Sequence, residues 1–171
     1  QQPHKKSIGS SGEFNHDDMV FTYNYDKSKD ETTINIKGKS EENYMAKGKV
    51  EKYFFTDLND DDKDESFIVL TDKKGQSMIK SFSILNSIPI EIYLDEVADP
   101  PANAKKKYSG QYGQLIETMS VKTPDGKVIK KEMRYNLVAG EAGLSLKPQG
   151  WTKAQLKSKS GQYKTGMYGT K

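Results

Sequence analysis

Apolar and polar residues alternate along most of the chain with the period of a β-strand. Within residues 19–25 every second side chain is large and apolar or aromatic, and Ile34 and Ile36 repeat the pattern after a short polar turn. Two such segments joined by a turn indicate a hairpin. Residues 40–46 follow, and a single capped helical turn is one way to place them.

The strongest pattern lies within residues 49–85, where two apolar runs flank an acidic loop. The first run ends at Thr56 and the second begins at Ser66, and the loop between them contains Asp-Leu-Asn-Asp-Asp-Asp-Lys-Asp-Glu. Short apolar runs bounded by turn residues are typical of buried strands. We therefore expect the acidic loop to turn the chain between two strands of the core.

The β pattern continues in the second half of the chain. Residues 88–94 place branched apolar side chains on one face. Pro89 cannot donate to the ladder, so this strand is expected to lie at a sheet edge or to begin at Pro89. Residues 99–107 contain two prolines and three consecutive lysines, which predict an exposed loop. The segments 115–121 and 127–138 flank a Thr-Pro-Asp-Gly turn, which predicts a second hairpin.

About eight or nine short strands, with no helical pattern longer than two turns, predict an all-β protein. We expect a single antiparallel β-sandwich or flattened barrel with little helix. Both ends of the chain are rich in Gly, Ser and Lys, and such segments bury too little apolar surface to order their backbone. The predicted organisation is a flexible arm over residues 1–13, a β domain over 14–151 and a basic, disordered tail over 152–171.

Charge is distributed unevenly along the chain. The formal net charge is +3, yet Glu141 is the last acidic residue and six lysines follow it, so the body carries −3 and the tail +6. A basic tail suggests contact with a polyanion or an acidic partner, and a solvated tail that maintains solubility is the simpler explanation. The ten tyrosines fall mostly at strand-face spacing, which favours packing over the stacking of nucleic-acid bases.

Several kinds of chemistry are disfavoured by composition. The chain has no cysteine, which removes disulfides, thiolate metal sites and thiol nucleophiles. Its two histidines, His4 and His16, both lie near the N-terminus, which argues against a histidine general base and a zinc site. No common hydrolase, zinc-protease or phosphate-binding motif is present, so we expect a protein that is not an enzyme. No apolar run reaches the roughly 18 residues that a membrane span requires.

The acidic loop carries oxygen ligands at alternate positions. Four of them match the spacing of calcium-binding loops: Asp57, Asn59, Asp61 and Glu65. Asp62 stands where such loops favour glycine for a left-handed turn, and Lys63 adds a positive charge beside the ligands. Two interpretations therefore stay open, a Ca²⁺ site or an acidic turn between strands, and no other cofactor is required.

One short string occurs twice, as Ser109-Gly110-Gln111-Tyr112 and again over residues 160–163. In a loop, Ser-Gly-x-Tyr offers a hydroxyl, a flexible backbone and an amphipathic ring that can enter the cleft of a partner. A turn with a packed tyrosine is the alternative interpretation.

The order of elements and motifs suggests a known family. A strand, the acidic loop over residues 57–65 and a hairpin are followed by Tyr-Ser-Gly at 108–110 and the Pro-Asp-Gly turn at 124–126. The most specific part is Arg-Tyr-Asn-Leu-Val-Ala-Gly-Glu-Ala-Gly-Leu-Ser-Leu over 134–146. In these features residues 48–148 resemble the periplasmic inhibitors of invertebrate-type lysozyme, in which a β-sandwich projects a Ser-Gly-x-Tyr loop into the lysozyme cleft and blocks it.

The resemblance places the inhibitory loop just after the strand that follows the acidic loop. There this chain reads Lys-Gly-Gln-Ser-Met over residues 74–78, without the family's tyrosine. Inhibitory-loop residues are carried over to Gly75 and Ser77 by position. The motif itself points to a second set: Ser109, Gly110 and Tyr112.

The resemblance implies an exported binding protein of the bacterial envelope, periplasmic or secreted, that inhibits lysozyme or a related wall-degrading enzyme through a cleft-inserting loop. Its partner would be a protein, a muramidase, rather than nucleic acid or the membrane interior, and a homodimer is compatible with the sequence. The alternative is a calcium-stabilised surface or secreted domain that binds protein or glycan and does not inhibit an enzyme.

Overall fold

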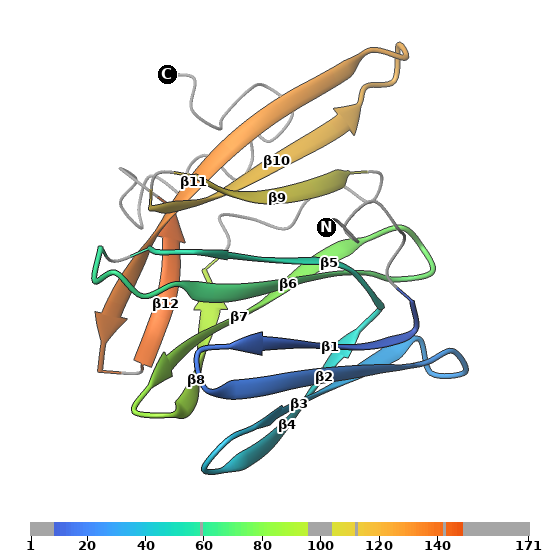
Figure 1. Ribbon diagram of the computed structural model, residues 1–171. Helices are drawn as coiled ribbons and strands as arrows, with labels where there is room; N and C mark the ends of the chain where they lie inside the picture. Colours follow the sequence, from blue (N-terminus) through green and yellow to red (C-terminus); the bar gives the residue numbers. More distant parts are fainter. Residues whose placement is uncertain (1–8, 59, 96–103, 112, 142, 149–171) are drawn as a thin grey trace, which may run out of the picture. The chain divides into compact units, whose positions relative to one another are not determined.

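The structure is a computed structural model, and in the residues that it describes all regular structure is β (Figure 1). It describes residues 9–58, 60–95, 104–111, 113–141 and 143–148. The strands in this part of the chain are β1 (Ser11–His16), β2 (Met19–Asp26), β3 (Glu31–Lys37), β4 (Glu41–Lys47), β5 (Lys49–Thr56), β6 (Glu65–Thr71), β7 (Ser77–Leu85), β8 (Ile88–Leu94), β9 (Lys105–Gln111), β10 (Gln114–Lys122), β11 (Val128–Gly140) and β12 (Gly143–Pro148). The all-β prediction is confirmed.

The strands form two sheets. One has the order β1-β2-β3-β4, and the other has the order β5-β6-β7-β8-β12-β11-β10-β9. The strand pairs whose register is defined are antiparallel, except for the parallel pair in which Leu144 to Leu146 of β12 lie opposite Ile92 to Leu94 of β8. This topology fits the predicted sandwich or flattened barrel.

Several details differ from the predictions. The described part of the chain contains twelve strands rather than eight or nine, and one strand pair is parallel. β8 lies between β7 and β12 rather than at a sheet edge, with Pro89 as its second residue. β1 begins at Ser11, inside the segment predicted as a flexible arm, and β4 occupies the residues for which a helical turn was one interpretation. A lone helical turn is weakly stable, so pairing of β4 with β3 outweighs it. β9 contains the three lysines predicted to lie in a loop, and the side chain of Lys106 is only 8% exposed. Residues 1–8 and the predicted tail lie outside the described residues.

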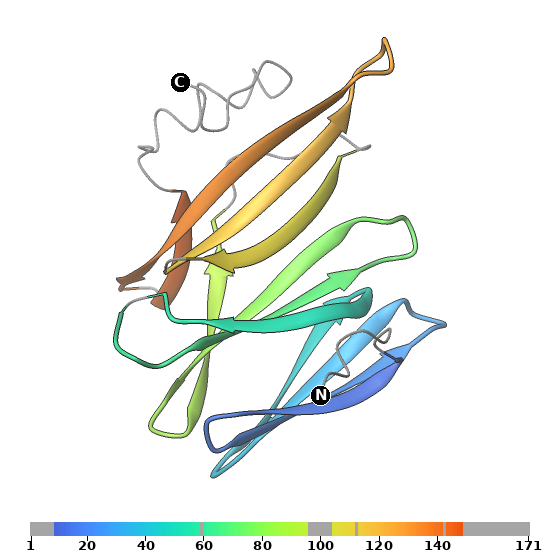
Figure 2. The same cartoon turned by 45° about the horizontal axis from the view of Figure 1, so that its top comes forward.

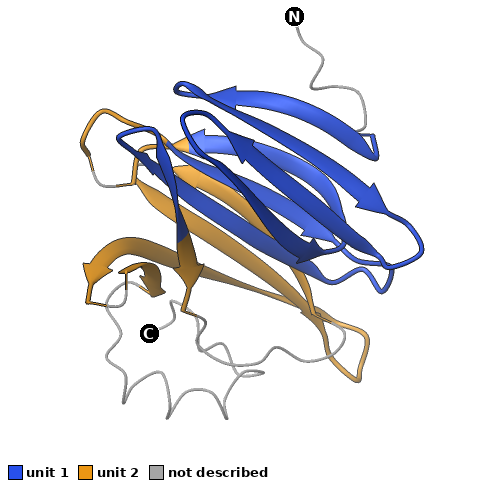
Figure 3. Cartoon of the chain, turned by 90° about the horizontal axis from the view of Figure 1, so that it is seen from below, with its two compact units in different colours: residues 1–55, 65–91 blue, residues 56–64, 92–171 orange. Residues whose placement is uncertain are grey.

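The chain divides into two compact units, which Figure 3 colours separately. Unit 1 comprises Gln1–Phe55 and Glu65–Glu91, and unit 2 comprises Thr56–Asp64 and Ile92–Lys171. The acidic loop therefore belongs to unit 2, although the strands on either side of it lie mostly in unit 1. Each unit is described by itself below.

Unit 1 is a sandwich with one apolar core. The buried cluster draws side chains from all four strands of the smaller sheet and from β5, β6 and β7. The ring of Phe14 stacks on the rings of Phe21 and Tyr53, with centroids 4.7 and 4.2 Å apart. The first six residues of β6 are all buried, which explains why that part of the sequence is a nearly continuous apolar run.

Unit 2 contains a buried carboxylate among apolar neighbours. Glu117 of β10 is 2% exposed. Its carboxylate accepts hydrogen bonds from the hydroxyls of Tyr108 and Tyr135, at 3.1 and 3.2 Å. The Lys106 ammonium lies 3.5 Å from the same carboxylate. Because a buried charge is costly unless it is paired and hydrogen-bonded, this network favours one register for β9, β10 and β11.

We expect Glu117→Ala to lower the free energy of unfolding by about 3–5 kcal/mol, since it removes the carboxylate from a buried ion pair. Glu117→Gln keeps an acceptor for the tyrosine hydroxyls and should lower the free energy of unfolding by less than Glu117→Ala does. Urea unfolding measures both. The control is Glu132→Ala, which removes an exposed carboxylate 2.9 Å from Arg134 and should cost at most about 1 kcal/mol. Equal losses of unfolding free energy in the two alanine variants would contradict the stabilising role assigned to the buried Glu117 carboxylate.

Candidate functional site

The loop position singled out by the family resemblance is the tight turn between β6 and β7, in unit 1. The N–H of Asp72 donates to the carbonyl of Gln76, and the N–H of Gly75 donates to the carbonyl of Asp72, both at 2.9 Å. Asp72 Oδ1 accepts from the N–H groups of Lys74 and Gln76, at 2.9 and 2.8 Å. Gly75 has a φ of 84°, which suits glycine. Four hydrogen bonds thus hold the turn in one conformation.

Asp30, in the turn between β2 and β3, fastens this turn to its neighbour. Its Oδ2 accepts a hydrogen bond from the backbone N–H of Lys73 at 3.0 Å, and its Oδ1 accepts one from the Tyr25 hydroxyl at 2.8 Å. The Lys73 ammonium donates in turn to the carbonyl of Lys27 at 2.8 Å. Both hydrogen bonds lower the pKa of Asp30, and the bond from the Lys73 N–H has a larger effect than the bond from the Tyr25 hydroxyl.

Gly48, between β4 and β5, closes the same end of unit 1. Its N–H donates to the carbonyl of Asp30 at 2.8 Å, and its own carbonyl accepts from the Thr32 hydroxyl at 2.5 Å. A Cβ at Gly48 would lie 2.8 Å from the backbone of Thr71, and φ there is 98°. A side chain at Gly48 would therefore push the end of β6, which leads into the β6–β7 turn, away from the β4–β5 junction.

The exposed residues of this turn are two lysines. Lys73 and Lys74 are exposed, whereas Gly75 is half-buried. Ser77 opens β7 opposite Thr71, and the hydroxyls of Ser77 and Thr71 lie 3.3 Å apart. The comparison with the family by position therefore selected Gly75 and Ser77, which belong to the framework of the turn. It missed Lys73 and Lys74, whose side chains are exposed to solvent. The signal for the lysines was the Asp-Lys-Lys-Gly string itself, because the central residues of such a turn point into solvent.

The Asp30 anchor predicts an acid-dependent stability. The pKa of Asp30 is lowered in the folded protein. Its contribution to the stability of the folded state is therefore complete above the pKa that Asp30 has in the unfolded chain, and it is lost as pH falls through the pKa of the folded state. We expect Asp30→Asn to lower the melting temperature at pH 7. The gap between wild type and variant should narrow as pH falls from about 5 to about 2.5. A gap that stays constant across thermal melts in this range would contradict the anchor.

The Ser-Gly string that precedes Tyr112 lies in a strand of unit 2. Ser109 pairs with Ile116 and Gly110 with Leu115 of β10, so both belong to β9 rather than to a projecting loop. A Cβ on Gly110 would lie 2.7 Å from Thr56 Cγ2, which shows that the backbone packs closely there. Tyr112 lies outside the described residues.

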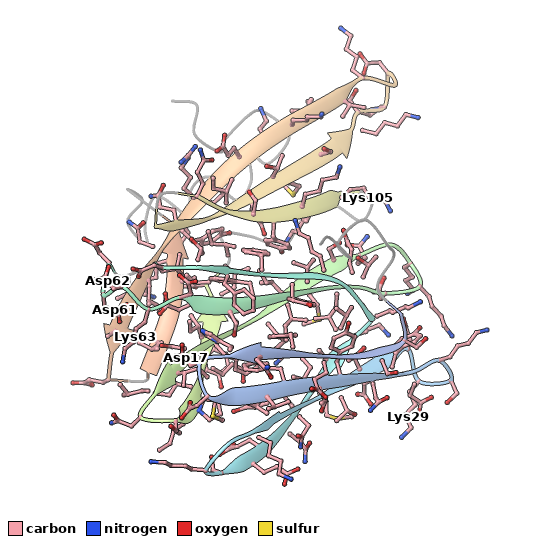
Figure 4. All side chains as sticks on the ribbon, viewed as in Figure 1. Asp17, Lys29, Asp61, Asp62, Lys63 and Lys105 are labelled. Atoms are coloured by element: carbon pink, nitrogen blue, oxygen red, sulfur yellow. The ribbon has the colours of Figure 1, made fainter. Side chains whose placement is uncertain are left out.

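The acidic loop, also in unit 2, is held by its own carboxylates. Asp57 accepts hydrogen bonds from the N–H groups of Asp61 and Asp62, at 3.4 and 2.9 Å, and Asp61 accepts one from the N–H of Lys63 at 3.0 Å. Figure 4 labels Asp61, Asp62 and Lys63 together on this loop. Asp60 and Asp62 have φ values of 59° and 64°, so the left-handed turn expected at Asp62 is present.

The four residues proposed as calcium ligands are divided between the two units. Asp57 and Asp61 lie in unit 2, Glu65 begins β6 in unit 1 with 1% exposure, and Asn59 is not among the described residues. Within the described ranges, no three acidic or histidine side chains gather in a group that could hold a metal ion. The hydrogen bonds of Asp57 and Asp61 are those of an acidic turn.

The structure does bring the acidic loop and the β9–β10 turn to one place in unit 2. A Cβ on Gly113 would lie 3.5 Å from the carbonyl oxygen of Asp57, and Leu58 is buried with 8% exposure. Thr56 contacts the strand end at Gly110. The described candidate residues therefore fall into one group in each unit: Glu65, Gly75 and Ser77 in unit 1, and Asp57, Asp61, Ser109 and Gly110 in unit 2.

We expect Asp57→Ala to lower the free energy of unfolding by about 1 kcal/mol, because two backbone N–H groups lose their acceptor. The loss should be the same in calcium and in chelator. Thermal melts of the wild type and the variant, each in calcium and in chelator, measure this. A calcium-dependent rise in the melting temperature of the wild type that Asp57→Ala abolishes would instead establish an ion site.

Comparison of the chain with protein-family models, curated proteins and solved structures found no match. In the described part of the chain there is no helix that is long and apolar enough to cross a membrane. The functional argument therefore depends on the geometry of the two groups of residues and on the sequence resemblance.

Proposed function

We propose that this protein is a binding protein that inhibits a lysozyme or a related wall-degrading enzyme, and that the β6–β7 turn enters the enzyme's cleft. The observation that carries the proposal is the rigidity of this lysine-bearing turn. Asp72 and Gly75 fix its conformation, and Asp30 binds the N–H of Lys73. A segment that is already ordered loses little conformational entropy on binding, so more of its contact energy appears as affinity.

Charge complementarity supports the same surface. Enzymes that hydrolyse glycosidic bonds generally use a pair of carboxyl groups beside the scissile bond, and a cation presented to them gains both attraction and orientation. The Lys73 ammonium already donates to the carbonyl of Lys27. Lys74 is therefore the residue that we assign to the carboxylates of the cleft.

The family resemblance supports the location of the site. It places the inhibitory loop at residues 74–78, where Gly75 shapes the turn and Ser77 begins β7. In this proposal a lysine takes the role that a tyrosine has in the family. An inhibitor of this kind would act outside the cytoplasm, in the periplasm or after secretion, and would not itself be an enzyme.

Inhibition assays test the proposal directly. The purified protein is added to invertebrate-type, chicken-type and goose-type lysozymes, and the loss of lytic activity is measured. We expect inhibition of at least one of them, and we expect Lys74→Glu to weaken it by about 10- to 100-fold, as for a reversed charge in an interface.

The matched control is Lys127→Glu. Lys127 is also exposed and also ends an Asp-x-Lys stretch in a hairpin turn, but it lies between β10 and β11. The Lys127→Glu variant should have the same inhibition constant as the wild type. Full activity of all three lysozymes, or equal effects of the two variants, would refute the proposed site.

A further inference from the structure

The outward face of β9, β10 and β11, in unit 2, is strongly basic. Five cationic side chains occupy its alternate positions: Lys105, Lys107, Lys122, Lys130 and Arg134. Glu132 is the single acidic residue at the described outward positions of these strands, and it forms an ion pair with Arg134 at 2.9 Å. We call this surface the basic face. Figure 2 shows its three strands side by side, and Figure 4 labels Lys105 at the start of β9.

The register places cations beside the two hydroxyl groups on the outward face of β10. Ser120 of β10 lies opposite Lys105 of β9 and opposite Lys130 of β11. Thr118, two residues earlier, lies opposite Lys107 of β9 and opposite Glu132 of β11. Neighbouring strands are about 4.8 Å apart. A chain lying along β10 would therefore meet these two hydroxyl groups beneath it, with ammonium groups on both sides at Ser120 and on the β9 side at Thr118.

Beyond the buried apolar Ile116, the same face carries a hydrogen-bonded group of polar side chains. Gln114 Nε2 donates to Asn136 Oδ1 at 3.0 Å, and Arg134 Nη1 donates to Gln114 Oε1 at 3.2 Å. The described outward positions of β9, β10 and β11 hold no aromatic side chain. Single-stranded nucleic acids bind largely by stacking their bases on aromatic rings, so the basic face lacks the main feature of such a site.

We propose that the basic face binds an acidic polysaccharide, a sugar chain that carries carboxylate groups. Its carboxylates would pair with Lys105, Lys107 and Lys130, and its hydroxyls would exchange hydrogen bonds with Thr118 and Ser120. These residues lie in unit 2 and are distinct from the β6–β7 turn. The protein therefore has a glycan-binding surface in addition to its enzyme-binding turn.

Binding to polygalacturonate, measured by calorimetry at several salt concentrations, tests the surface. The variant Lys105→Gln/Lys107→Gln/Lys130→Gln should bind at least about tenfold more weakly and should lower the logarithmic salt slope by about two to three, since fewer counterions are exchanged. The control, Lys29→Gln/Lys37→Gln/Lys39→Gln, makes the same change in net charge on exposed residues of unit 1. Its affinity should stay within about twofold of wild type. Equal losses for the two variants would overturn the proposal.

A second ligand separates sugar recognition from charge alone. Polyglutamate carries similar carboxylates without sugar hydroxyls, so we expect it to bind more weakly than polygalacturonate. The variant Thr118→Val/Ser120→Ala should weaken only the binding of the polysaccharide. Equal or tighter binding of polyglutamate would point to an acidic protein instead, and tighter binding of single-stranded DNA would point to nucleic acid. Either result would overturn the proposal, while lysozyme inhibition, assayed separately, would be unaffected by it.

Discussion

The proposed inhibitory turn depends on the carboxylate of Asp30. Through Lys73 and Tyr25, this single side chain connects the β6–β7 turn to the strands of the smaller sheet. Gly48 completes the junction, because only a glycine allows the backbone beside Thr71 to approach so closely. The turn is therefore positioned by contacts that are distant in sequence, and its own short loop supplies only the local hydrogen bonds.

Unit 2 uses a buried charge in a comparable way. The three lysines that begin β9 alternate between its two faces: Lys106 turns inward to Glu117, whereas Lys105 and Lys107 point outward. The inward lysine joins the network that favours one register of β9 to β11, and that register places the outward lysines beside Thr118 and Ser120. The ion pair between Lys106 and the buried Glu117 carboxylate thus helps to determine which lysines of β9 lie on the basic face.

The strand periodicity predicted the all-β class and both hairpins, because alternation along a half-buried sheet is a local property. Burial of Lys106 and Glu117 was not predictable in this way, since it depends on tyrosines from β9 and β11 that meet only in the folded sheet. β4 escaped prediction because its residues carry few apolar side chains and gain stability from pairing with β3. The role of Asp30 is likewise tertiary, as its partner Lys73 is 43 residues away.

The central claim is that a preformed turn between β6 and β7 binds the enzyme. Amide chemical-shift mapping tests this claim directly. A lysozyme that the protein inhibits is titrated into the isotope-labelled protein. The account predicts that the largest shift changes fall on residues 72–77, and that Lys74→Glu weakens the binding that they report by about 10- to 100-fold. Shift changes confined to other segments, with the β6–β7 turn unperturbed, would contradict it.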